Sequence, residues 1–272
     1  RGAGGGGMKP SVERERPTGR RPWTVRRLLI LAALSLAALP TAATADRGTL
    51  APGPAARSRS GAEPMEGRSD RTGSLGVLRH PVLLVPGWGD GREQLLPLRR
   101  RFLEAGWKKG DVDVVQFRDP VGSNVAHAEE LATTVDRFLE RTGAGQVDVV
   151  AHSMGGLAVR RYLLDGGNVR VRRVAFLATP HRGTLSARLA WGEGAREMER
   201  GSRFLLDLIR ARAVPRGVEA ITVRTPLDLH VVPNESATLP GIPNLEVCCP
   251  THAGLLDDDA TFELVERFLE RR

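Results

Sequence analysis

One serine stands where a predicted buried strand passes directly into a predicted helix. Residues 147–157 read Val-Asp-Val-Val-Ala-His-Ser-Met-Gly-Gly-Leu, so Ser153 follows an apolar run and precedes two glycines. A tight strand-to-helix turn leaves room only for small residues two positions either side of the serine, and Ala151 and Gly155 stand there. Such a turn exposes the hydroxyl above a helix N-terminus, whose dipole favours a developing anion. The pattern predicts a nucleophilic serine rather than an ordinary glycine-rich helix start.

The elements that position this serine alternate between strands and helices from Val77 onward. Short apolar runs indicate strands buried on both faces, and apolar residues at helical spacing indicate amphipathic helices between them. This alternation predicts right-handed βαβ units and a mostly parallel sheet with helices on both faces. The predicted strands are 81–85, 112–117, 147–151, 174–178, 221–224 and 245–248, and the predicted helices are 93–105, 126–140, 155–164 and 261–269.

The serine segment resembles a known family. Ala-His-Ser-Met-Gly-Gly at 151–156 is similar to the small bacterial secreted lipases and esterases, in which alanine replaces the first glycine of the pentapeptide. Residues 81–87 resemble the first core strand and oxyanion loop of that family, with Pro86 where a histidine is usual, so we expect a stiffer loop. Residues 177–184 resemble its strand-six turn. The likeness extends over roughly 80–270 and implies the α/β-hydrolase fold.

A serine hydroxyl is a weak nucleophile and needs a base that a carboxylate orients. In the fold that the resemblance implies, the acid and then the base follow the serine, each on a loop after a core strand. Of the three histidines after Ser153, His252 occupies the family's place for the base, between the last predicted strand and the closing helix. His181 belongs to the strand-six turn, and His230 lies two residues after the best acid candidate. The alternative for His252 is a structural loop histidine.

The acid is expected to be Asp228, which follows the predicted strand 221–224 through a turn and precedes a Val-Val-Pro segment similar to the acid loop of lipases. Its rivals are Asp257, Asp258 and Asp259. These precede the closing helix, where acidic residues usually cap the helix and interact with its dipole. A calcium site at the three aspartates is the other alternative.

The tetrahedral intermediate of acyl transfer carries an oxyanion that needs aimed N–H donors. We expect them from the backbone of Met154, directly after the nucleophile, and of Trp88, after Pro86-Gly87. The Trp88 side chain could instead serve packing or line an acyl pocket. A helical insertion around 184–212 holds many apolar residues, which favours a lid or acyl-chain wall, with plain packing onto the sheet edge as the alternative.

The N-terminal region is predicted to be separate from the catalytic domain at 77–272. Residues 1–45 resemble a leader with a signal peptide, because basic residues precede an apolar run at 28–39 and Ala43-Thr44-Ala45 fits a cleavage site before Asp46. The run is too short to span a bilayer of roughly 30 Å, although a retained signal anchor is the alternative. Residues 46–76 lack apolar periodicity and are predicted to be a disordered linker. The protein is therefore expected to be secreted.

Most of the net charge of +8 belongs to the leader, since the two signs nearly balance from Val77 onward. This distribution argues against a nucleic-acid partner, which would need a clustered positive surface. The adjacent Cys248 and Cys249 are interpreted as two small buried strand residues, with a vicinal disulfide as the alternative.

The leading functional hypothesis is hydrolysis of acylglycerols or related apolar esters, with transient contact to a lipid interface. Acyl transfer, thioester or polyester cleavage, or an inactive hydrolase fold used for binding are the alternatives. No cofactor and no metal are expected, because the acyl-enzyme route needs neither.

Overall fold

A single parallel sheet organises the part of the chain that carries the predicted site. The computed structural model describes residues 1–2 and 79–271, so the predicted leader and linker lie outside the described residues, apart from residues 1 and 2. Six strands follow the order β2-β1-β3-β4-β5-β6, and every neighbouring pair is parallel. The strands are β1 (Val82–Val85), β2 (Val112–Val114), β3 (Val147–His152), β4 (Val171–Leu177), β5 (Glu219–Arg224) and β6 (Asn244–Glu246).

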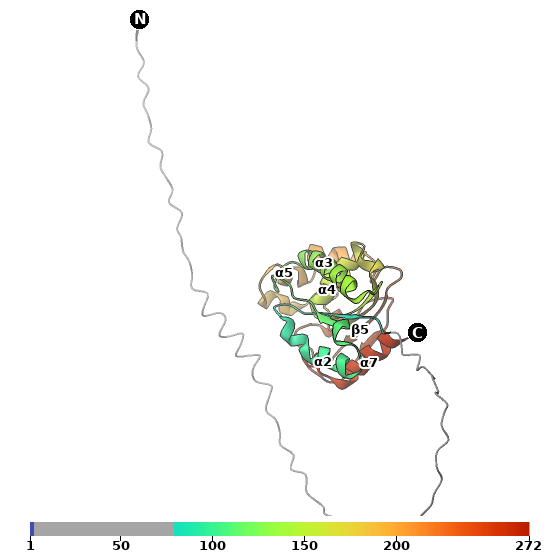
Figure 1. Cartoon of the computed structure of the whole chain (residues 1–272). Coiled ribbons are helices and arrows are strands. Elements are labelled where there is room, and N and C mark those ends of the chain that lie inside the picture. Colours follow the sequence, from blue (N-terminus) through green and yellow to red (C-terminus); the bar gives the residue numbers. More distant parts are fainter. Residues whose placement is uncertain (3–78, 272) are drawn as a thin grey trace, which may run out of the picture. The chain divides into compact units, whose positions relative to one another are not determined.

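Helices cover both faces of this sheet (Figure 1). They are α2 (Leu96–Glu104), α3 (Asn124–Thr142), α4 (Gly155–Leu164), α5 (Glu193–Met198), α6 (Arg203–Arg210) and α7 (Asp259–Glu270). Shorter 3-10 helices are η1 (Arg92–Leu95), η2 (Lys109–Asp111), η3 (Gly167–Val169), η4 (Leu185–Leu189), η5 (Asn234–Ala237) and η6 (Gly254–Leu256). Apolar residues of α3 and α4 share one core cluster, whereas those of α2 and α7 share the cluster on the opposite face.

The strands divide their side chains between these two clusters. In β1, Leu83 and Val85 pack with α3 and α4, while Val82 and Leu84 pack with α2 and α7. Successive side chains of a strand point to opposite faces, so a strand buried on both faces must be apolar throughout. For this reason, the continuous apolar run at 81–85 correctly predicts a strand, β1, that is buried on both faces of the sheet.

The parallel arrangement brings several loops to one edge of the sheet. β1 runs into the turn at Gly87 and Trp88, β3 into Ser153, and β5 into the loop that holds Asp228. Because the carboxyl ends of parallel strands meet at the same edge, these loops are neighbours, as the alternating pattern predicts.

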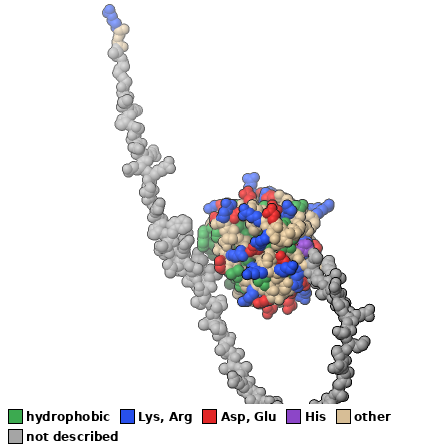
Figure 2. All heavy atoms as spheres, in the orientation of Figure 1, with side chains coloured by type: hydrophobic (Ala, Val, Ile, Leu, Met, Phe, Trp, Pro, Cys, Tyr) green, Lys and Arg blue, Asp and Glu red, His purple; other side chains and the backbone are tan. Residues whose placement is uncertain are grey.

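Charged side chains of both signs are interspersed over the visible face of this region (Figure 2). Among the helices described at 79–271, none combines the length and the apolar character needed to cross a lipid bilayer.

Candidate active site

The nucleophile candidate occupies a strained turn. Ser153 lies between β3 and α4 with a φ of 52°, a left-handed conformation that is uncommon for a residue other than glycine. Its backbone N–H donates to the Leu177 carbonyl at 2.8 Å, which ties the turn to the end of the neighbouring strand β4. The predicted strand-to-helix junction is therefore present at Ser153.

The two glycines after Met154 are required by close packing. A Cβ atom on Gly155 would lie 2.2 Å from the Pro86 carbonyl oxygen, and one on Gly156 would lie 2.0 Å from the Thr179 hydroxyl. Both separations are far below van der Waals contact, so any side chain would push α4 away from the loops that follow β1 and β4. The small residues predicted from turn geometry thus also set the distance between α4 and its neighbours.

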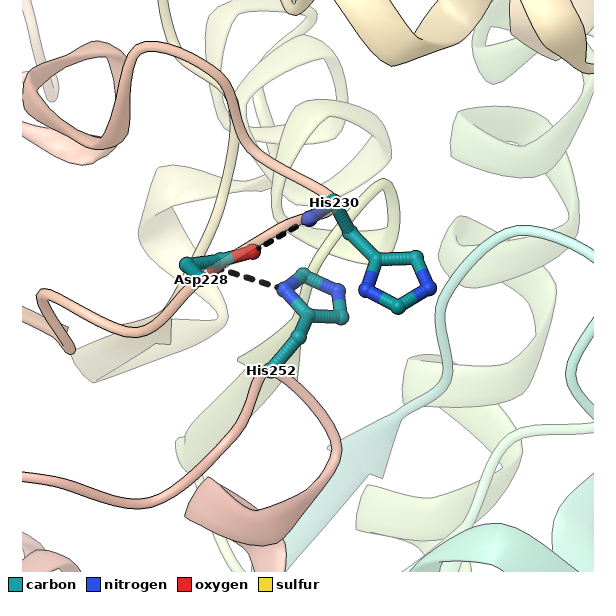
Figure 3. A group of neighbouring side chains, drawn as sticks. All are labelled: Asp228, His230 and His252. Atoms are coloured by element: carbon teal, nitrogen blue, oxygen red, sulfur yellow. Dashed lines mark hydrogen bonds and ion pairs between the residues drawn. The ribbon is translucent and has the colours of Figure 1, made fainter. Parts of the chain in front are cut away.

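Asp228 and His252 lie together, as Figure 3 shows. The Nδ1 atom of His252 is 2.7 Å from Oδ2 of Asp228, and both side chains are buried. The other carboxylate oxygen accepts the backbone N–H groups of His230 and Val231, each at 2.8 Å. Burial would raise the pKa of Asp228, but the hydrogen bond and charge of His252 and these N–H groups outweigh it, so the pKa is lowered. The carboxylate is ionised and holds the imidazole in one orientation.

His252 lies beside the serine turn. The His252 carbonyl oxygen is 3.1 Å from Nε2 of His152, and the two rings are 4.6 Å apart between centroids. His152 immediately precedes Ser153 in the chain, so the loop that holds His252 lies against the serine turn. No hydrogen bond joins Ser153 to His252 within residues 79–271. Catalytic hydrogen bonds are often long without substrate and shorten in the complex.

The two predicted oxyanion donors flank the same serine. Met154 directly follows it, and a Cβ on Gly87, the residue before Trp88, would lie 2.9 Å from the Ser153 Cβ. Among the hydrogen bonds of residues 79–271, neither the Trp88 nor the Met154 backbone N–H is a donor, so both remain free for an anionic oxygen. The Trp88 indole donates to the Trp191 carbonyl at 3.0 Å, and the two rings meet edge to face.

Two residues that sequence reasoning missed contact this site. His152 is fully buried, and burial, followed by the charge of His252, lowers its pKa to about 3. Asp90 faces it, with Oδ2 at 3.8 Å from Nδ1 of His152, and burial raises the pKa of Asp90 to about 6. Because the imidazole is neutral, this contact is not an ion pair. In the sequence, Asp90 is marked only by its position shortly after Gly87 in the predicted oxyanion loop. An aspartate at that position did not by itself indicate a contact with the site.

His230 is a third neighbour. Its ring stacks on His252, with centroids 4.8 Å apart, and partial burial, then the charge of His252, lowers the pKa of His230. The side chains of Asp228, His230 and His252 are close enough together for metal ligation. However, both Asp228 oxygens already accept hydrogen bonds, and one of them orients the imidazole. The donor set fits a carboxylate–imidazole pair better than a metal centre.

The rival aspartates have other partners. Asp258 caps α7, accepting the Thr261 N–H at 2.7 Å, and Asp257 and Asp259 both pair with Arg101. These contacts are the helix-capping and surface roles that the sequence favoured over a catalytic acid.

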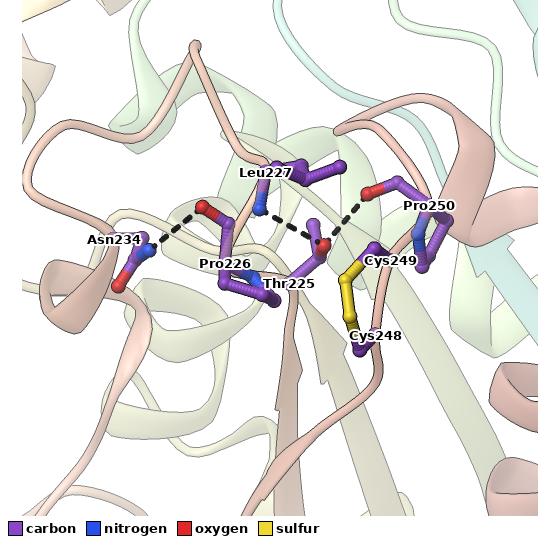
Figure 4. Close-up of a disulfide and its surroundings, with 7 residues drawn as sticks. All are labelled: Thr225, Pro226, Leu227, Asn234, Cys248, Cys249 and Pro250. Carbon is purple, nitrogen blue, oxygen red and sulfur yellow. Dashed lines mark hydrogen bonds between the residues drawn. A yellow bond between two sulfur atoms is a disulfide. The ribbon is translucent and has the colours of Figure 1, made fainter.

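The cysteine interpretation was wrong. β6 ends at Glu246, and both cysteines lie beyond it, exposed and joined by a disulfide (Figure 4). β6 is the edge strand of the described sheet and pairs with β5. The pairing ends where the Val247 N–H donates to the Arg224 carbonyl, and the chain leaves the sheet after that bond. The Thr225 hydroxyl then donates to the Pro250 carbonyl at 2.6 Å, which joins the loop before Asp228 to the loop before His252.

The segment 184–212 contains η4, α5 and α6. Met198, Leu205 and Leu208 pack against Met154 and Leu157, so part of the segment covers the start of α4. At its beginning, the Thr184 hydroxyl donates to the His230 carbonyl at 2.8 Å. A second part stays exposed: Leu189 and Trp191 keep 80% and 48% of their surface accessible.

Comparison with known proteins agrees with this architecture. The family described as alpha/beta hydrolase fold matches residues 80–207. A Bacillus licheniformis lipase, BlEst2 in its mature form, superposes with a TM-score of 0.62 at 17% identity, covering 70% of this chain and 92% of that one. Aspergillus fumigatus lipase B gives a TM-score of 0.62 at 18% identity, covering 71% of this chain and 52% of that one. A gene product of Listeria innocua gives a TM-score of 0.55 at 15% identity, covering 71% of this chain and 95% of that one.

These likenesses, together with the six-stranded parallel sheet and its flanking helices, confirm the predicted α/β-hydrolase fold.

Proposed function

We propose, on the premise of an α/β-hydrolase fold, that this chain is a serine hydrolase that cleaves carboxylic esters. The observation that carries the proposal is the buried Asp228–His252 hydrogen bond, 2.7 Å long, next to the strained turn of Ser153. Acyl transfer in this fold needs a nucleophile, an orienting carboxylate and a base, which follow one another along the chain in that order.

In the proposed reaction, the Ser153 oxygen attacks the ester carbonyl carbon while Nε2 of His252 accepts the hydroxyl proton. The N–H groups of Trp88 and Met154 stabilise the oxyanion, and His252 returns the proton to the leaving alcohol as the ester bond breaks. Water then attacks the acyl-enzyme with His252 as base, which releases the acid and the free serine. Asp228 keeps Nδ1 protonated and stabilises the imidazolium. No step uses a metal or a cofactor.

The proposed substrates are acylglycerols or related apolar esters. Exposed apolar side chains come from the 184–212 segment and from the acid loop, namely Leu185, Leu189, Trp191, Leu227 and Leu229. Apolar side chains gather at the left margin of Figure 2, on the side where Figure 1 labels α5. Large exposed apolar groups commonly mark contact sites, here proposed to be an acyl chain or a lipid surface. Two of the structurally similar proteins are lipases.

The test is hydrolysis of p-nitrophenyl esters of several chain lengths by the native protein and Ser153→Ala. We expect the variant to lose turnover and to lose labelling by a fluorophosphonate probe, which should map to Ser153 in the native protein. Thr133→Ala, which removes an exposed hydroxyl from α3, is the matched control and should keep both. A fully active Ser153→Ala variant would refute the assignment, and an unlabelled native protein would favour a binding role.

The proposal includes export. The apolar run at 28–39 and the Ala-Thr-Ala segment support it. The protein recovered from the culture medium should begin at Asp46. Recovery from the membrane with residues 1–45 still attached would favour a signal anchor.

A further inference from the structure

One cavity of the described region lies apart from the residues of the candidate active site. It has a volume of about 330 Å³ and is lined by α4, by the residues that follow β4, by the end of α6 and by the segment around 238–244. Ser153, Asp228 and His252 do not line it. Arg160 belongs to the lining and lies seven residues after Ser153, roughly 10 Å along α4 at the usual helical rise.

Arg160 is a buried cation with an unused donor. The residue is 2% exposed, and its Nε and Nη2 atoms donate to the carbonyls of Ala213 and Leu208 at 3.2 and 2.8 Å. The remaining nitrogen, Nη1, is buried without a hydrogen-bond partner among the described residues, which also offer Arg160 no ion pair. Burial lowers its pKa to about 10, so the guanidinium is still charged at neutral pH. A buried charge without a partner is costly, and a bound anion would offset that cost.

His181 adds a second unsatisfied group to the lining. Its ring has no exposed surface, and neither ring nitrogen has a hydrogen-bond partner among residues 79–271. Burial, followed by the charges of Arg160 and Arg182, lowers its pKa well below the ordinary value. The neutral imidazole therefore offers one N–H donor within a positive local field.

Arg182 is the second arginine of the lining. Its guanidinium donates to the Glu235 carbonyl and, at 3.1 Å, to the Thr238 hydroxyl, but it pairs with no carboxylate among the described residues. No aspartate or glutamate of the described part of the chain contributes to the lining. Two guanidinium groups thus face the cavity without a counter-charge, which fits an anionic ligand.

Apolar side chains form much of the remaining wall, including Ile209, Leu239 and Pro240. The cavity volume of about 330 Å³ is roughly that of ten molecules of liquid water. This volume is larger than a small inorganic anion requires. Ligand sites usually combine an apolar wall with a few placed polar groups, and the planar guanidinium matches a carboxylate with two parallel hydrogen bonds.

We propose that this cavity binds a small organic carboxylate, with its charged group at Arg160 and His181 and a short apolar tail along Leu239 and Pro240. The proposal is independent of the ester-hydrolase proposal, because it concerns binding at residues that take no part in that reaction.

The test is calorimetric titration of the full chain with hexanoate at low ionic strength, compared with hexanol and inorganic phosphate. Hexanoate should bind at least about tenfold more tightly than either, since hexanol lacks the charge and phosphate lacks the tail. Equal affinity for hexanol would show an apolar cavity, and equal affinity for phosphate would show a simple anion site. Either result, or no binding at all, would overturn the proposal.

Variants place the binding in this cavity. Arg160→Met should abolish hexanoate binding, but Arg160 also anchors two carbonyls and this variant could fail to fold. Ala213→Phe fills the cavity and should abolish binding with the arginine intact, and Arg182→Gln should weaken it by about three- to tenfold. Arg210→Gln, which removes an exposed cation of α6 that lies outside the lining, should change nothing. Full affinity in Ala213→Phe would mean that hexanoate binds elsewhere and would refute the assignment.

Discussion

Replacing Asp90 with asparagine is expected to stabilise the protein at pH 8 and to have a much smaller effect near pH 3.5. Asp90 keeps only 22% of its side chain accessible. The ionisable side chain beside it is that of His152, a neutral imidazole whose Nδ1 lies 3.8 Å from Oδ2 of Asp90. Burial is the largest influence on Asp90 and raises its pKa from 3.8 to about 6, against the opposing charge of His252 and the backbone of Gly87. The folded protein thus disfavours the ionised carboxylate, and asparagine removes that charge while keeping the shape.

The magnitude follows from linkage between proton binding and folding. The pKa difference for Asp90, from 3.8 to about 6, corresponds to about 3 kcal/mol at roughly 1.4 kcal/mol per pKa unit. Partial exposure reduces this to about 2–3 kcal/mol. Below pH 3.8 the carboxyl is protonated in both states and its contribution is fully present. Between pH 3.8 and 6 the folded state binds more protons than the unfolded state, so the free energy of unfolding falls as the pH rises, and above pH 6 the loss is complete.

The assay is urea unfolding of the native protein and Asp90→Asn at several pH values between 3.5 and 8. The stability difference, variant minus native, should grow through the window from pH 3.8 to 6 and then stay constant. Glu93→Gln, which removes an exposed carboxylate from the adjacent 3-10 helix, controls for the change in net charge. A stability difference that is the same at pH 3.5 and pH 8 would refute the argument that burial controls Asp90.

Two further predictions concern the proposed machinery and its packing. Asp228→Asn should lower kcat for ester hydrolysis by about 10³–10⁴-fold with the fold intact, because His252 loses the carboxylate that fixes its tautomer; a kcat within tenfold of the native value would argue against the triad. Gly156→Ala should destabilise the protein by about 1–3 kcal/mol in thermal or urea unfolding, since the new Cβ would lie 2.0 Å from the Thr179 hydroxyl. Gly145→Ala, whose Cβ would meet nothing within 4 Å, is the matched control, and equal effects at both sites would contradict the packing argument.

The nucleophile turn could be predicted from sequence because its signals are local. An apolar strand, a serine, two glycines and an amphipathic helix occupy consecutive positions, and each one constrains the backbone within a few residues. The observed φ of Ser153 and the close packing of Gly155 and Gly156 express the same constraints in space. The alternation of strands and helices likewise predicted the sheet, since burial on both faces demands continuous apolar runs.

The cysteine segment shows where local signals end. A run of Leu-Glu-Val-Cys-Cys is compatible with a strand, but a strand continues only while a neighbour offers hydrogen bonds. Within residues 79–271, β6 pairs only with β5, and the pairing stops near Arg224, so the cysteines leave the sheet and become exposed.

The sequence by itself determined the strand and helix pattern and the identity of the nucleophile candidate, because these depend on residues next to one another in the chain. Only the tertiary structure decided that Asp90 would be buried against His152, that His230 would stack on His252, and that Arg160 and His181 would share a cavity. Each of these environments is made by segments far apart in sequence; the contact of His152 with His252 spans 100 residues. Burial and charge pairing are properties of the assembled fold, so the ionisation of these groups is established only when the chain has folded.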